Sequence, residues 1–180
     1  MKATARIALV SLLSPLLVVC SALAAGPERA DFNGSKGSAD WRFRVERSLV
    51  EKEYEASENG LGLQAPNRRH GFRAYFEAEG VRLVDRTAPG SPELARVRVA
   101  SIGRAEERRA LAAGTVGWSG NSVEVARSSA VSEQFENSPE GLRQILTIAH
   151  RPPGVGDLEV VFEVATAVVE RARDGVALVA

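Results

Sequence analysis

The sequence predicts a mainly β protein, an antiparallel β-sandwich of about eight or nine short strands with one short N-terminal helix. Residues 130–169 carry this prediction, because apolar and polar side chains alternate there as they do along strands with one buried face. Turn-forming residues interrupt the alternation at 138–141 (Ser-Pro-Glu-Gly) and at 152–154 (Pro-Pro-Gly). This stretch is therefore expected to form three successive strands joined by two turns.

The alternation also predicts which side chains enter the core. Two apolar sets each share one face of a strand: Leu142, Leu146 and Ile148 in the middle strand, and Leu158, Val160, Phe162 and Val164 in the last one. Glu159 falls on the opposite, wetter face of the last strand. The register of that strand therefore predicts a buried Phe162 and an accessible Glu159.

The first 25 residues have the three parts of a secretory signal peptide. Lys2 and Arg6 form a basic start, residues 7–19 form an apolar run, and residues 22–24 (Ala-Leu-Ala) give a small-x-small cleavage pattern. The apolar run is short for a membrane span and is interrupted by Pro15, so no integral span is expected after cleavage. The mature protein is predicted to be secreted or to stay in the bacterial cell envelope.

Cys20 leaves a second processing route open. Residues 17–20 (Leu-Val-Val-Cys) resemble a lipobox, in which the cysteine becomes lipidated and forms the mature N-terminus. A lipobox has a small residue before the cysteine, and Val19 is not small, so loss of Cys20 with the leader is the favoured route. Because the chain has one cysteine, no disulfide is expected in the mature fold.

Composition places the chain among ordinary soluble globular proteins, with 44% hydrophobic and 26% charged residues. The 23 basic and 23 acidic groups balance, and removal of Lys2 and Arg6 with the leader leaves 21 basic against 23 acidic groups, a net charge of −2. A nearly neutral domain has no strong field to attract nucleic acid or an anionic membrane. No nucleic-acid partner is therefore expected.

Residues 26–39 are rich in Gly, Ser and charged side chains, which predicts a flexible spacer. Residues 40–180 are expected to form the β-sandwich domain. The final run 176–180 is apolar to its last residue, which suggests the N-terminal part of a longer protein. Asp-Gly at 174–175 predicts a tight turn that folds this run back on residues 165–171.

The domain is expected to begin with the helix. Asp40 is a candidate N-cap, and the Glu- and Lys-rich text that follows favours a helix to about Ser57, with Asn59-Gly60 as its stop signal. The alternating residues 41–45 are equally compatible with a short strand. Residues 60–69 contain Pro66 and are expected to form a loop.

Further strands follow this loop. Residues 72–77 and 81–86 predict a hairpin that turns at Glu79-Gly80, and residues 95–99 resume the alternation as a third strand. Residues 105–113 favour a short helix, a turn or a mobile loop. A further turn at 119–121 leads into a strand at 122–126.

No catalytic or metal-binding constellation is assembled by the sequence. His70 and His150 lie about eighty residues apart, without the neighbouring His, Cys or clustered carboxylates that a metal site needs. Residues 117–120 (Gly-Trp-Ser-Gly) lack the nucleophile-elbow pattern, and no calcium-loop pattern occurs. We therefore expect no cofactor, no metal and no enzymatic activity.

Two loops are the candidate binding sites. The first loop is Asn67, Arg68, Arg69 and His70, in which residues 68–70 form the densest basic spot, and Arg151 begins a Pro- and Gly-rich connection. Basic and amide side chains on loops are suited to contact an anionic group, a glycan or a protein surface. These five residues are the candidate partner-binding positions.

Four phrases of the sequence resemble a recurrent N-terminal domain of large secreted bacterial proteins: residues 53–60 (EYEASENG), 63–70 (LQAPNRRH), 80–86 (GVRLVDR) and 136–142 (ENSPEGL). The later parts of those proteins carry FG-GAP, integrin-alpha-like or related β-propeller repeats. The resemblance covers residues 40–180 and transfers no catalytic residue. It implies a secreted, mainly β, surface-associated module with its partner unspecified. No propeller repeats lie within these 180 residues, and repeats downstream of them remain an expectation from the resemblance.

Three functions follow as hypotheses. The leading one is a non-catalytic secreted or cell-surface module that spaces or caps the domains after it. The alternative is a stand-alone envelope protein that binds a glycan or a protein through the two loops. A hydrolase is the least favoured, because nucleophile, base and orienting group are not brought together by any motif.

Overall fold

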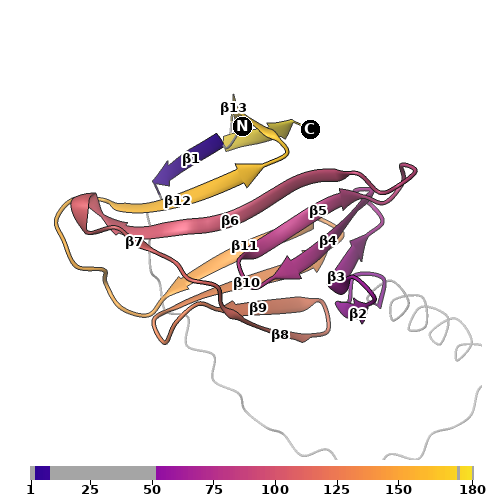
Figure 1. The fold of residues 1–180 in the computed structure, drawn as a ribbon, viewed down its shortest axis with the longest axis horizontal. Coiled ribbons are helices and arrows are strands. Elements are labelled where there is room, and N and C mark those ends of the chain that lie inside the picture. The colour runs from indigo at the N-terminus through magenta and orange to yellow at the C-terminus, as the bar shows by residue number, and fades with distance from the viewer. Residues whose placement is uncertain (1–2, 9–51, 174, 180) are drawn as a thin grey trace, which may run out of the picture.

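Antiparallel β-strands make up most of the described chain, which confirms the predicted mainly β fold class (Figure 1). The computed structural model describes residues 3–8, 52–173 and 175–179. Two sheets face each other, and a separate two-stranded sheet lies beside them. Cys20, the predicted spacer and the predicted helix up to residue 51 lie outside the described residues.

The larger sheet has eight strands, in the order β1-β12-β6-β5-β4-β3-β2, with β7 paired to β6. Every pairing in it is antiparallel. Its strands are β1 (Ala3–Ala8), β2 (Ser57–Asn59), β3 (Gly62–Asn67), β4 (Phe72–Glu77), β5 (Gly80–Asp85), β6 (Glu93–Arg104), β7 (Arg109–Ala110) and β12 (Leu158–Ala165).

The second sheet has four antiparallel strands in the order β11-β10-β9-β8. They are β8 (Thr115–Ser119), β9 (Ser122–Ala126), β10 (Val131–Ser138) and β11 (Gly141–Ile148). The hairpin of β13 (Val168–Ala172) and β14 (Gly175–Val179) forms the third, two-stranded sheet. A single 3-10 turn, η1 (Ala105–Glu107), follows β6.

The main core lies between the two larger sheets. Ala74, Phe76 and Val81 from the eight-stranded sheet pack with Val123, Val125 and Phe135 from the four-stranded sheet. The rings of Phe76 and Phe135 are 5.5 Å apart at an interplanar angle of 53°, a tilted aromatic pair across the interface. A second cluster joins Val99, Ile102 and Val160. The alternating apolar residues of β4, β9 and β10 therefore fill one shared interior.

The three predicted strands of the stretch 130–169 are present as β10, β11 and β12, and the expected apolar residues of β11 pack on the core. The connection after β11 differs from a simple turn, because it carries the chain from the four-stranded sheet to the eight-stranded one. Val160 and Val164 are buried as predicted, whereas Phe162 is only partly buried. The predicted register of β12 is thereby confirmed.

The predicted hairpin of residues 72–77 with 81–86 is confirmed as β4–β5, and the predicted return of residues 176–180 onto 165–171 is confirmed as β13–β14, which pairs 168–172 with 175–179. The β4–β5 turn, however, lies at Ala78-Glu79, and Gly80 already pairs with Glu77 in the ladder. Gly80 is required there because a Cβ would collide with the backbone of Val97 and Arg98. The segment 105–113 contains η1 and the short strand β7.

Two predictions about the N-terminal part of the domain are wrong. Residues 60–69 are mostly strand β3 and not a loop. Pro66 is tolerated in this strand because pairing with β2 ends at Gln64. On that side, proline therefore has no neighbouring strand to which an N–H would have to donate. The helix does not reach Ser57, because Ser57 begins strand β2. Asn59 instead accepts a hydrogen bond from Leu61 N in the β2–β3 turn.

Candidate functional site

Asn67, the first of the candidate binding residues, is fully buried at the end of β3. Its Nδ2 donates to Asn137 Oδ1 at 2.9 Å and to the carbonyl oxygen of Ser138 at 2.8 Å. Its Oδ1 accepts from the backbone N–H of His70 at 3.1 Å. The side chain of Asn67 therefore shapes the turn that follows and is not itself presented to a partner.

The turn held by Asn67 does present Arg68, Arg69 and His70 on the surface. His70 Nε2 donates to the carbonyl oxygen of Pro139 at 3.0 Å, and the His70 ring stacks on Phe72 with centroids 6.3 Å apart. Arg68 makes an exposed ion pair with Glu53 at 3.1 Å. This loop is thus a small, supported basic surface.

Glu140 lies close to this basic surface in the β10–β11 turn. A hydrogen bond with Ser138 is the main cause that holds the pKa of the Glu140 carboxyl below its ordinary value, and the charges of Arg69 and His70 lower it further. An acidic group therefore already offsets part of the positive charge of the loop.

Arg151 lies at the other end of the four-stranded sheet. Ala149 N donates to Ala130 O at the start of β10, whereas Asn67 and His70 contact the end of β10 at Ser138 and Pro139. The eight residues of β10 span roughly 24 Å at the usual strand rise. The two predicted loops are therefore too far apart to hold one small ligand together.

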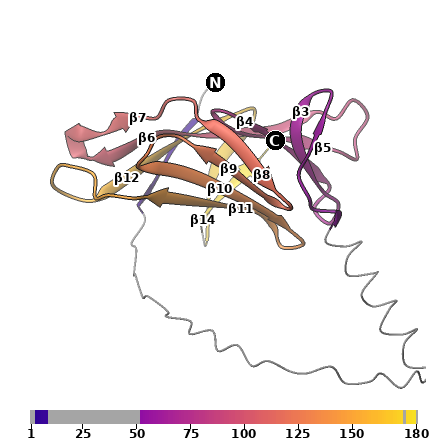
Figure 2. The same cartoon turned by 90° about the horizontal axis from the view of Figure 1, so that it is seen from below.

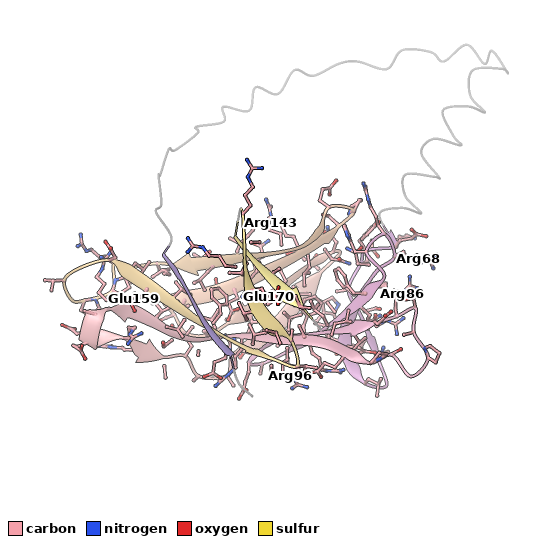
Figure 3. The ribbon with its side chains drawn as sticks, turned by 90° about the horizontal axis from the view of Figure 1, so that it is seen from above. Arg68, Arg86, Arg96, Arg143, Glu159 and Glu170 are labelled. Carbon is pink, nitrogen blue, oxygen red and sulfur yellow. The ribbon has the colours of Figure 1, made fainter. Side chains whose placement is uncertain are left out.

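Figure 3 shows the same separation, with Arg68 at one end of the sheets and Glu159, which follows the 149–157 connection, at the other. Around Arg151 there is a shallow hollow of about 390 Å³. Its lining includes Ile102, Leu111, Val131, Ile148 and His150. Of the candidate residues, the structure thus brings together three at one loop and leaves Arg151 alone at the opposite end.

A buried ion pair between Arg127 and Glu133 is the most unusual polar feature of the interior, and the sequence analysis missed it. Arg127 Nε lies 2.6 Å from Glu133 Oε1, and the two side chains are 1% and 0% exposed. Arg127 also donates to the carbonyl oxygens of Ala78 and Ala112. All these partners are internal, which gives the pair a structural role.

The outer face of the larger sheet carries a lattice of exposed and half-buried ion pairs. Arg96 bonds both Glu77 at 3.0 Å and Glu93 at 3.3 Å, and Arg82 bonds Glu77 at 3.3 Å. Arg98 pairs with Glu163 at 2.7 Å. Three of the four charged groups that line the hollow of about 340 Å³ over this face are already paired, namely Arg96, Arg98 and Glu163.

One member of this lattice has a perturbed ionisation. Partial burial opposes the charged form of Glu93, but hydrogen bonds from Thr166 Oγ1 and from Arg96 outweigh it and hold the pKa of Glu93 below its ordinary value. Glu77 and Glu93 hold the Arg96 guanidinium in place, and Thr166 holds the Glu93 carboxylate. The face is therefore a stabilising surface.

The hairpin β13–β14 carries more than half of the exposed large hydrophobic side chains in the described residues. In the described part of the chain, four of the seven exposed large hydrophobic side chains belong to it: Val168 at 62%, Val176 at 46%, Leu178 at 41% and Val179 at 44%. The cross-strand pairs Val168–Val179 and Val169–Leu178 place these side chains on both faces of the hairpin. Figure 2 shows β14 projecting from the sheets.

Only the base of this hairpin is anchored. Val169 packs on a small cluster of Ala95, Val164 and Ala167, and Figure 3 shows Glu170 on the projecting part. A two-stranded hairpin is marginally stable by itself in water, and one that is apolar on both faces gains stability when another surface covers it. The β13–β14 hairpin is therefore the best candidate interaction surface.

Two arrangements are absent from residues 3–8, 52–173 and 175–179. No group of three or more His, Cys, Asp or Glu side chains there is arranged to hold a metal ion. No helix in that part of the chain has the length and apolar composition needed to cross a membrane.

In comparisons with known proteins, no family model, no curated protein and no solved structure matches the chain.

Proposed function

We propose that this chain is a non-catalytic, secreted or cell-surface β-sandwich module that binds another protein domain through the β13–β14 hairpin. The observation that carries the proposal is the concentration of Val168, Val176, Leu178 and Val179 on one projecting hairpin. Exposed apolar surface of this kind favours contact with protein. The module would thereby fix the position of a domain that follows it or lies beside it.

The predicted leader supports export, and the resemblance to N-terminal domains of FG-GAP and integrin-alpha-like proteins suggests that the partner is a β-propeller repeat domain. The buried polar groups support a structural role, because they form two separate pairs, Arg127 with Glu133 and Asn67 with Asn137, and each pair also donates to backbone carbonyls. Such groups stabilise a scaffold on which a surface contact is built.

A second candidate function is binding of a glycan or a protein by the basic loop. It is favoured by the firm support of Arg68, Arg69 and His70 on Asn67 and Pro139. The two functions use opposite chemistry, since the hairpin offers apolar contact and the loop offers charge and hydrogen bonds. They can therefore be separated by the place where a partner touches the protein.

Site-specific photo-crosslinking in the exporting cell tests the proposal. A photoreactive amino acid is placed at Val168 or Leu178 on the hairpin, and at Val155 as a control that is 82% exposed on a distant loop. We expect one defined protein adduct from the hairpin positions and none from Val155. An adduct formed from Arg69 alone would instead favour the loop function.

Export is tested separately by mass spectrometry of the protein outside the cytoplasm. We expect an N-terminus at Ala25 or Gly26, as the residues 22–24 predict. An acylated Cys20 would show that the alternative lipoprotein route is used. A retained Met1 would contradict export with processing.

A further inference from the structure

Strand β12 lies next to the outermost strand of the larger sheet, and that outermost strand is β1. The two pair antiparallel through six residue pairs, from Ala3 opposite Val164 to Ala8 opposite Glu159. Figure 1 shows β1 along the outer side of β12, with β6 on the inner side. Because β1 lies inside the predicted leader, cleavage would remove it from the sheet.

We propose that the outer edge of β12 is a strand-acceptor site in the processed protein. Its occupant is an extended segment of a partner protein in which apolar residues alternate with basic ones. The inference rests on the proposed function in one respect, the removal of the leader during export. The β12 edge would be a second part of the interaction surface, beside the β13–β14 hairpin, and its acidic side chains would recognise a basic partner.

The backbone of β12 supplies the first part of the argument. Loss of β1 leaves a row of N–H and C=O groups along an eight-residue strand whose other side is paired with β6. Such an edge accepts an added strand through main-chain hydrogen bonds, and the side chains alongside it select which strand fits.

The two faces of β12 supply the selection. Val160, Phe162 and Val164 face the core side, while Glu159 and Glu163 lie on the opposite face. In the register of β1, Arg6 stands opposite Val161, between the positions opposite Glu159 and Glu163. An occupant that places a basic residue at the register position of Arg6 and small or apolar residues at its neighbouring positions matches this edge.

Both acidic groups keep an acceptor for the occupant. Arg98 and Arg108 bond the Oε2 atoms of Glu163 and Glu159, at 2.7 and 3.1 Å. In the described interactions the Oε1 atoms are not used by these arginines, so each carboxylate can accept a further donor. A basic side chain on the incoming strand would meet two carboxylates along one edge.

The same acidic residues disfavour a second copy of this chain as the occupant. If β12 paired antiparallel with β12 of another copy about Val161, Glu159 of each chain would stand directly opposite Glu163 of the other. Like charges directly opposite in a sheet are destabilising. A partner segment with basic residues avoids this repulsion.

The acceptor edge is continuous with the apolar hairpin. Chain segment 166–167 joins β12 directly to β13, and β13 contacts both β12 and β1. One extended partner segment can therefore lie along β12 and continue onto Val168 and its neighbours. The two surfaces form a single interface at one edge of the sheet.

Hydrogen exchange on the exported protein, with its cleaved N-terminus verified, tests the inference. The probe is a synthetic peptide with the sequence of residues 2–9 (KATARIAL), and its control replaces the arginine with glutamate. We expect exchange of the β12 amides that point away from β6 to slow by about tenfold with saturating peptide, and the control peptide to bind several-fold more weakly. Amides of β10 serve as the internal reference.

A protein variant tests the charge selection. Glu159→Gln combined with Glu163→Gln should abolish the preference for the arginine peptide, whereas Glu124→Gln, exposed on β9, should keep it. Absence of peptide protection in a correctly cleaved protein would overturn the inference, and so would protection, without peptide, of the β12 amides that point away from β6, or a dimer formed through β12. A retained leader would overturn it together with the export proposal, so the two failures are distinguishable.

Discussion

Arg127 connects the two sheets through Glu133. The ion pair of 2.6 Å joins the end of β9 to β10, while the same guanidinium donates to Ala78 O at 2.5 Å in the β4–β5 turn of the other sheet. Glu133 Oε2 accepts from Gln144 Nε2 of β11 at 2.5 Å. A single buried charge pair thereby ties together strands of both layers.

Glu133→Gln should therefore destabilise the fold strongly. The substitution keeps the shape of the side chain but leaves the buried Arg127 charge uncompensated, which costs about 3–5 kcal/mol of unfolding free energy. The matched control is Glu136→Gln on the same strand, whose pair with Arg143 is exposed and worth about 0–1 kcal/mol. Urea denaturation measures both. Equal losses would show that burial does not set the strength of the pair at Glu133.

The buried asparagine pair should hold the basic loop. Asn137 Nδ2 donates to the carbonyl oxygens of Tyr54 at 3.0 Å and Pro66 at 2.8 Å, and Oδ1 accepts from Asn67. Asn137→Ala leaves these interior groups without partners, at about 1–3 kcal/mol for each unsatisfied group. We expect lower stability and faster amide exchange at residues 67–70. Asn59→Ala, at an exposed turn, is the control and should change the exchange there little.

The face assignment of β12 predicts different costs for two neighbouring substitutions. Phe162→Ala removes a partly buried ring from the cluster of Val99, Ile102 and Val160, and we expect a loss of about 2–4 kcal/mol. Glu159→Ala removes a partly exposed pair with Arg108 and should cost about 0–1 kcal/mol. Chemical denaturation would show the reverse order if the strand were shifted by one residue.

Acid should weaken the fold partly through Glu93. Its folded pKa is lowered, so its contribution to stability is fully present above the unfolded value of about 4.3 and is lost as the pH falls through the folded pKa. Glu93→Gln should therefore give a shallower decrease of unfolding free energy between about pH 5 and pH 3. Parallel curves for the variant and the natural chain, measured by denaturation at each pH, would contradict this origin.

Local patterns were sufficient for the strands that alternate. The period-two spacing of β10, β11 and β12 and the turn residues around them depend on neighbouring positions, and the structure has those strands where the sequence predicts them. Pro66 misled the prediction for 60–69, because a proline argues against a strand unless the strand is at an edge. Strand β3 has an unpaired edge beyond Gln64 because β2 is short, and neighbouring residues alone do not reveal where that pairing ends.

The candidate site was less predictable for a physical reason. Asn67 was expected on the surface because an asparagine between a proline and two arginines is typical of a loop. The residue that pairs with it in the interior, Asn137, is seventy positions away and cannot be inferred from neighbouring residues. Arg127 and Glu133 are charged, and charged residues are expected on the surface unless a buried partner is known. Only the assembled sheets show that these polar groups satisfy one another. The exposed hairpin, by contrast, is visible in the sequence as the apolar run after Asp174-Gly175.

Because the chain passes from β11 in one sheet to β12 in the other, the larger sheet can be completed only after the four-stranded sheet has been synthesised. Ser101 of β6 and Val161 of β12 are paired, although sixty positions and the entire four-stranded sheet lie between them in the sequence. Closing such a long loop is entropically costly and slows folding. Because synthesis runs from the N-terminus, β6 gains its outer neighbour only after residue 165 has been made, whereas β2–β6 and the four-stranded sheet pair with neighbours that precede it in the chain.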